Sequence, residues 1–224
     1  MMRLILPLLF GLGGFAVLMW LGLWQLDRLD WKEGVLAEIE TRITAAPVSV
    51  PPVPDPEADR YLPVTATGEA TAAPLRVLVS AKVFGPGYRL IYPFRLDGGR
   101  EVMVDMGIIP VDAATPDLTG RLLDVTGNLH WPDEVDSFTP EADLAANIRF
   151  DREVPAMAAA LNTEPVLIIA RATEPNLLEI TPLPVTTEGI PNSHLGYAIQ
   201  WFGLALVWLG MTVFLLWRIR RRTV

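Results

Sequence analysis

The chain has 224 residues, 51% of them hydrophobic, and its 18 basic and 26 acidic residues give a formal net charge of −8. An acidic balance does not suit a phosphate backbone, so it argues against nucleic-acid binding. The absence of cysteine excludes disulfides, thiolate metal sites and a cysteine nucleophile, and two histidines are too few for a zinc cluster.

The first predicted element is a transmembrane helix at residues 4–26, which carry no charge. At about 1.5 Å per residue this block spans roughly 35 Å, enough to cross a hydrocarbon core of about 30 Å. A cleaved signal peptide has a shorter apolar core and a small-residue cleavage site, whereas "WQLDRLDWKEG" follows here. We therefore expect an uncleaved anchor. Only Met1, Met2 and Arg3 precede it, so no transit peptide is expected and a bacterial plasma membrane fits best.

A stalk helix is predicted at residues 27–46, because apolar residues recur every fourth position among charged ones. Residues 47–60 hold five prolines, which cannot continue a helix, so an extended linker follows. From residue 61 the pattern changes to short runs rich in β-branched and aromatic residues. These runs are "YLPVTATG", "RVLVSAKVF", "YRLIYPFRL", "EVMVDMGIIP", "LLDVTGNLHW" and "PVLIIARAT".

Two local features refine this β-rich region. Asp97, Gly98, Gly99 and Arg100 form a hairpin turn signal between two of the runs. Residues 154–161 read as one short helix. The fold class expected from the whole pattern is a membrane protein with two transmembrane α-helices flanking an extracytoplasmic α+β domain. That domain is dominated by a small antiparallel β-sheet or barrel.

The second transmembrane helix is predicted at residues 194–217, again a long uncharged block. Four arginines follow within residues 218–222, and basic residues beside a span favour the cytoplasmic side. Arg3 lies just before the first predicted helix and favours the cytoplasmic side for that end as well. Both termini are therefore expected in the cytoplasm, with the central domain in the periplasm.

No enzyme motif is found among the nucleophile-elbow, phosphate-loop and H-E-x-x-H patterns, so we do not expect an enzyme. Ser193 lies beside His194, but catalytic triads are built by convergence in space and not by sequence neighbours. Met103 and Met106 are three apart, which on a strand turns them to opposite faces, so metal binding by the pair is not expected and core packing is the default for at least one of them.

His194 is placed by topology at the outer membrane interface, where the first helix also leaves the bilayer near Trp24 and Arg28. Tyr197, Ala198, Trp201, Ala205 and Trp208 follow it on one helix face. An imidazole, aromatic rings and a nearby arginine suit a flat macrocycle with two carboxylates, which is a haem. An alternative stays open, since aromatic belts, snorkelling basic residues and helix caps are ordinary features of membrane interfaces.

Two motifs resemble the surfeit locus protein family of cytochrome c oxidase assembly factors. G-x-W-Q-x-x-R-x-x-W-K matches at Gly22, Trp24, Gln25, Arg28, Trp31 and Lys32, and N-x-H-x-x-Y-A-x-x-W-F matches at Asn192, His194, Tyr197, Ala198, Trp201 and Phe202. The family's V-N-R-G-W-V-P segment is altered here, since only the valine, the glycine and the proline of "VDMGIIP" at residues 104–110 match it. Partner contacts that the family makes through the missing Asn, Arg and Trp are therefore in doubt.

The resemblance implies a two-span protein that helps to mature subunit I of a haem–copper oxidase by binding and handing over haem a. Haem a synthase is a further partner on the same ground. His194 aligns with the family's haem ligand, so it is the expected metal ligand. The whole expected cofactor site is His194, Tyr197, Trp201, Trp24, Gln25 and Arg28. A cofactor-free membrane chaperone that stabilises subunit I is the alternative function.

Overall fold

The computed structural model describes all residues except 1, 82–84, 144, 189 and 222–224. The chain divides into two compact units, which are described separately below. One unit holds Met1–Glu38 and Thr187–Val224, and the other holds Ile39–Thr186. The last part of the predicted strand run at 76–84 falls outside the described residues. The end of the basic tail does so as well.

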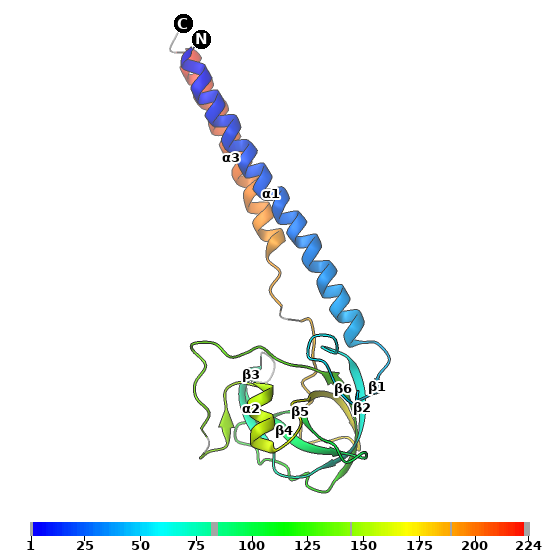
Figure 1. Cartoon of the computed structure of the whole chain (residues 1–224). Coiled ribbons are helices and arrows are strands. Elements are labelled where there is room, and N and C mark those ends of the chain that lie inside the picture. The colour runs from blue at the N-terminus through cyan, green and yellow to red at the C-terminus, as the bar shows by residue number, and fades with distance from the viewer. Residues whose placement is uncertain (1, 82–84, 144, 189, 222–224) are drawn as a thin grey trace. The chain divides into compact units, whose positions relative to one another are not determined.

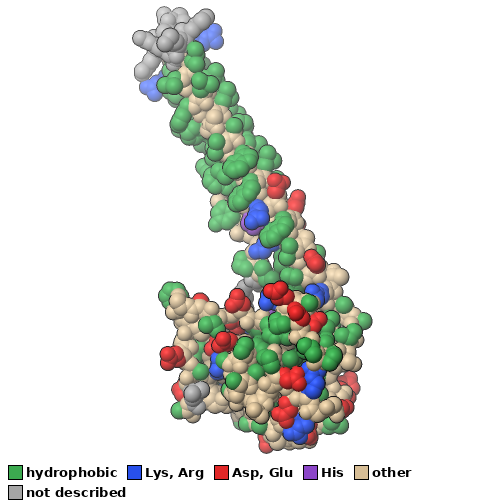
Figure 2. Space-filling view, in the orientation of Figure 1, with side chains coloured by type: hydrophobic (Ala, Val, Ile, Leu, Met, Phe, Trp, Pro, Cys, Tyr) green, Lys and Arg blue, Asp and Glu red, His purple; other side chains and the backbone are tan. Residues whose placement is uncertain are grey.

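The first unit is a pair of long helices, α3 (His194–Arg221) and α1 (Met2–Ile43) up to Glu38. Both are long and apolar enough to cross a membrane, which fits a membrane protein. Figure 2 shows hydrophobic side chains covering much of this pair. Helix α1 continues unbroken past residue 26, as a stalk helix requires, and ends at Ile43, three residues before the expected limit of 46.

Small residues allow the backbones of α1 and α3 to approach closely. Ala198 and Ala205 are buried on α3, and a Cβ added at Gly11 or Gly14 of α1 would lie 2.1 Å from Thr212 or 2.4 Å from Trp208. Trp208 also donates from Nε1 to the Gly11 carbonyl at 2.9 Å. Close packing of small residues and interhelical hydrogen bonds are what hold helices together in lipid.

The second unit is built mainly from strands, as expected (Figure 1). The elements are β1 (Val48–Ser49), β2 (Pro63–Ala70), β3 (Leu75–Ala81), β4 (Gly85–Leu96), β5 (Glu101–Pro110), β6 (Leu122–Leu129), β7 (Ile148–Arg149), α2 (Val154–Leu161) and β8 (Leu167–Glu174). The predicted helix at 154–161 is confirmed. The predicted hairpin is also confirmed, since the Leu96 amide donates to the Arg100 carbonyl at 2.8 Å and Gly99 takes a φ of +82°.

The described strands form a mixed sheet in which antiparallel pairings predominate, as expected, but three pairings are parallel. They run in the order β1-β2-β6-β8-β5-β4-β3-β7, and an added β2–β4 pairing links the chain of pairings into a ring through five strands. Strand β8 lies parallel to β5 because the segment between them crosses over through β6 and α2 before returning. The pairings β1–β2 and β3–β7 are parallel as well.

Strand β5 is buried on both faces, which explains why its sequence is apolar on both faces apart from Glu101 and Asp105. Met103 and Met106 are both in the core, at 0% and 1% exposure, and no metal-binding cluster is found among the described residues. Gly107 makes the local bend with a φ of +123°. A Cβ there would lie 2.1 Å from the Thr181 carbonyl oxygen.

Candidate functional site

The expected haem site begins at the first residue of α3. His194 is half-buried, and its Nδ1 lies 2.8 Å from Oε1 of Gln25 on α1. Both residues belong to the helix-pair unit, so this contact joins the two helices directly. Of the six residues expected to hold the cofactor, His194 and Gln25 are the two that the described contacts bring together.

This hydrogen bond decides which nitrogen of His194 is available. An amide oxygen accepts but cannot donate, so Nδ1 carries the proton in this arrangement. Nε2 then keeps its lone pair, and it has no hydrogen-bond partner among the described residues. Histidines that bind metals are usually held in this way, with the other ring nitrogen donating to an oxygen.

Of the other four residues, Tyr197, Trp24 and Arg28 lie on more exposed surface. Tyr197 and Trp24 are 49% and 44% exposed, and Trp201 is half-buried. Arg28 is exposed, with its guanidinium 4.8 Å from the ring centroid of Trp31. A guanidinium stacked on a ring still presents the donors along its edge, which is the side that binds carboxylates.

Two side chains near the expected site form hydrogen bonds within the helix-pair unit. Lys32 donates from Nζ to the Pro191 carbonyl, so it holds the segment before α3. Trp208, expected on the same face as His194, likewise hydrogen-bonds to α1. The two alanines of that face, Ala198 and Ala205, are buried.

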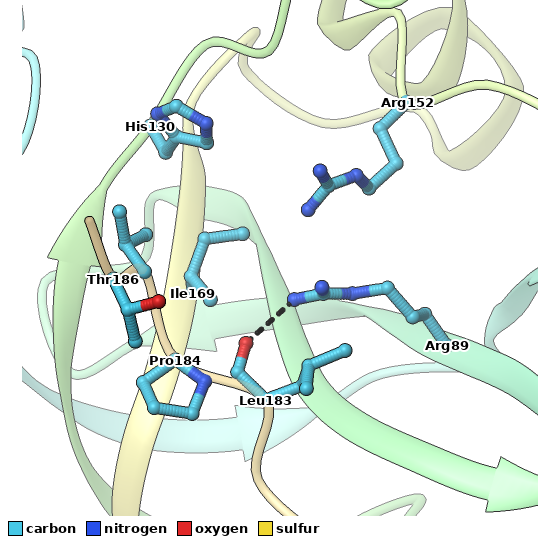
Figure 3. Close-up of a pocket in the computed structure, with 8 residues that line it drawn as sticks. Arg89, His130, Arg152, Ile169, Leu183, Pro184 and Thr186 are labelled. Atoms are coloured by element: carbon cyan, nitrogen blue, oxygen red, sulfur yellow. Dashed lines mark hydrogen bonds between the residues drawn. The ribbon is translucent and has the colours of Figure 1, made fainter. Parts of the chain in front are cut away.

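A second site, which was not predicted from the sequence, lies within the β-rich unit. Arg89, His130, Arg152 and Thr186 line a pocket of about 280 Å³, whose remaining lining is apolar. Figure 3 shows the two guanidinium groups directed toward the space that His130 and Thr186 face from the other side. Its members come from segments far apart in the sequence, so no local motif marks it.

A buried ion pair fixes Arg89, and an ion pair with the more exposed Glu134 fixes Arg152. Arg89 donates from Nε to Asp105 at 2.6 Å and from a terminal nitrogen to the Leu183 carbonyl at 2.9 Å. Arg152 donates from Nε to Glu134 at 3.1 Å. Burial by itself would raise the pKa of Glu134, but the hydrogen bonds to Arg152 and the charge of that arginine hold it below its usual value. Both members of this pair therefore stay charged at neutral pH.

His130 is neutral in this setting. Burial lowers its pKa from 6.5 to about 4, and the positive charges of Arg152, Arg60 and Arg89 act in the same direction, while Glu134 acts the other way. The ring stacks on Tyr61 with centroids 5.3 Å apart. Its Nδ1 is buried and has no hydrogen-bond partner among the described residues.

Comparison with known proteins identifies the family to which this chain belongs. A sequence model of the SURF1 family matches residues 12–206, a range that includes Gln25, His194 and every strand. The chain belongs to the SURF1 family.

Individual relatives are similar over most of the chain. Surfeit locus protein 1 of Rattus norvegicus is 26% identical over 209 residues, or 82% of this chain and 67% of the rat protein. Surfeit locus protein 1 of Homo sapiens is 28% identical over 212 residues, covering 83% and 69%. A SURF1-like protein of Rickettsia felis is 29% identical over 206 residues, covering 86% and 88%. Members of the SURF1 family are generally cytochrome oxidase assembly factors. The family is not a known enzyme family.

Proposed function

We propose that this protein is an assembly factor for haem–copper cytochrome c oxidase, and that it binds haem a through His194 and passes it to subunit I. The proposal includes a bacterial inner-membrane location, with both termini in the cytoplasm and the β-rich domain in the periplasm. Haem a synthase, as the source of the haem, is the second proposed partner.

The hydrogen bond between His194 Nδ1 and Gln25 Oε1 is the observation that carries the haem proposal. It leaves Nε2 as the free donor atom for iron, at the start of a helix that is apolar enough to lie in a bilayer. Bound haem would supply an iron centre destined for the oxidase, while this chain only holds and orients it. Tyr197, Trp201 and Trp24 offer aromatic surface, and the exposed edge of Arg28 suits a propionate.

The test is purification of the full chain from cells that make haem a, followed by an absorption spectrum. We expect a haem band in the unmodified protein and in His130→Gln, and loss of the band in His194→Ala. Haem retained in full by His194→Ala would contradict the ligand assignment. Co-purification of oxidase subunit I with a protein that never carries haem would instead support a cofactor-free chaperone.

A further inference from the structure

The pocket of the β-rich unit is cationic, although the surrounding region is acidic. Residues 27–193 contain 13 basic and 26 acidic residues. The charged residues that line the pocket are nevertheless Arg89 and Arg152, and no carboxylate is among its described lining residues. The charge of the pocket lining is therefore opposite to that of the surrounding region, which indicates a negatively charged ligand.

The carboxylates that pair with the two guanidiniums do not engage all of their N–H groups. Asp105 is fully buried, accepts from Arg89 Nε at 2.6 Å and lies 3.9 Å from one terminal nitrogen of Arg152. The second terminal nitrogen of Arg89 has no partner among the described residues, and that terminal nitrogen of Arg152 has only its long contact to Asp105. These N–H groups are held in place and are available to an acceptor in the pocket.

The charge balance favours a ligand with a single negative charge. Asp105 and Glu134 offset Arg89 and Arg152, and Arg60 adds one further positive charge close enough to act on His130. Nε of Arg60 is buried without a hydrogen-bond partner in the described part of the chain. The local surplus is therefore about one positive charge, which a monoanion neutralises and a phosphate dianion exceeds.

Shape and polarity narrow the ligand class. A volume of about 280 Å³ lies at the small end of ligand sites. The two guanidiniums line one side of the pocket and the Thr186 hydroxyl faces them from the other side (Figure 3), while Ile169, Pro184 and Val185 provide apolar contact. Guanidiniums pair well with the planar carboxylate group, and the apolar wall fits a short hydrocarbon body.

We propose that this pocket binds a small organic monocarboxylate, with the carboxylate on Arg89 and Arg152 and the hydrocarbon body against Ile169 and Val185. The pocket belongs to the β-rich unit and His194 to the helix-pair unit, so the proposal uses no residue of the haem proposal.

Isothermal titration calorimetry of the full chain in detergent, with sodium benzoate as the probe, tests this proposal. We expect saturable binding of benzoate, and none of benzamide, which has the same shape without the charge. Arg152→Gln combined with Glu134→Gln removes this ion pair without leaving the Glu134 carboxylate unpaired, and Asp105 keeps its pair with Arg89. It should weaken benzoate binding by about 10- to 100-fold, as expected for loss of a hydrogen bond to a charged group.

Two further variants keep the test valid if that double variant folds poorly. Thr186→Val removes one hydroxyl and should weaken binding by about 2- to 10-fold. Arg95→Gln removes one positive charge from an exposed arginine of β4 that pairs with Glu101, and should leave binding unchanged. The proposal fails if benzoate does not bind, if benzamide or inorganic phosphate binds as tightly, or if Arg95→Gln weakens binding as much as Thr186→Val.

Discussion

Gln25 does for His194 what a backbone carbonyl or carboxylate does for many metal-binding histidines. By accepting from Nδ1, its amide oxygen fixes the ring orientation and the tautomer together. Without Gln25 the ring would be free to rotate and to place the proton on Nε2, where it would block coordination. Gln25 is therefore expected to control haem affinity without touching iron.

The first prediction is that Gln25→Ala lowers haem affinity by about 10- to 100-fold, the usual effect of losing such a supporting group. Gln200→Ala is the matched control, since Gln200 is exposed on α3. Haem titration of the two purified variants, followed by absorbance, gives the comparison. Equal affinities in both variants would show that Gln25 does not orient the ligand.

The second prediction concerns His130, whose pKa lies near 4 in the folded protein against 6.5 when exposed. A lowered histidine pKa means that the folded state binds the proton less well than the unfolded state. Its stabilising contribution is therefore complete above pH 6.5 and is lost as the pH falls toward 4. The loss over that range is about 3 kcal/mol, since one pKa unit corresponds to about 1.4 kcal/mol.

Urea unfolding at pH 7 and pH 4, followed by near-ultraviolet circular dichroism, measures this contribution. His130→Gln should lose about 3 kcal/mol less than the unmodified protein between the two values, because its side chain does not titrate. Both proteins share the loss caused by carboxylates such as Glu134 and Asp151, whose pKa values are lowered by their arginine partners. Identical losses in the two proteins would contradict the assignment.

At the scale of elements, the helix pair depends on which glycines face the partner helix. Gly14 lies against the Trp208 ring, and that ring is held by its hydrogen bond to Gly11, so it cannot swing away freely. A Cβ added at Gly13, one position earlier, would meet no atom within 4 Å among the described residues. Substitution by alanine should therefore lower the stability of the helix pair at Gly14 and should not lower it at Gly13.

The third prediction is that Gly14→Ala destabilises the helix pair by about 1–3 kcal/mol through overpacking, whereas Gly13→Ala is neutral or stabilising by up to about 1 kcal/mol. Titration with sodium dodecyl sulfate, monitored by tryptophan fluorescence, reports on separation of the helices. A shift in the same direction and of the same size for both variants would mean that the close contact at Gly14 is not important.

The elements themselves were largely predictable from the sequence, because they depend on local pattern. Apolar blocks located both long helices, β-branched runs located six strands, and the Asp97–Arg100 turn set the β4–β5 pairing. The parallel β5–β8 pairing was not predictable, since it depends on where a crossover segment returns. The two-residue strands β1 and β7 were missed, as they are too short to show alternation.

The two candidate sites also differ in how far they could be predicted from the sequence. His194 and Gln25 stand in recognisable motifs, so their proximity could be expected, although the hydrogen bond itself could not. The second pocket had one signal in the sequence, which is Asp105 within an otherwise apolar strand. A fully buried carboxylate requires a cationic partner, but nothing local indicates that Arg89 and Arg152 supply it.

For the whole molecule, the main expectation is the orientation across the membrane. Because the chain has no cysteine, single cysteines can be introduced and labelled without background. Phe138 is 89% exposed in the β-rich unit, and Arg220 is exposed near the end of α3. These two positions are expected on opposite sides of the bilayer.

The fourth prediction is that a membrane-impermeant maleimide added to intact spheroplasts labels Phe138→Cys and does not label Arg220→Cys. After the membrane is permeabilised, both variants should be labelled, which controls for reactivity. Labelling of Arg220→Cys alone in intact cells would reverse the proposed topology. Labelling of both before permeabilisation would rule out an intact two-span arrangement.

The ring of strand pairings also has a consequence for the timing of biosynthesis. Its last member, β8, ends at Glu174, and α3 begins only at His194. At a synthesis rate of about 5–20 residues per second, the 19 residues between them take about 1–4 s to make. Every strand needed for ring closure is thus synthesised before α3. The domain can therefore begin to fold before the helix that carries His194 has been made. Pairing of His194 with Gln25 would then be among the last steps in the maturation of the protein.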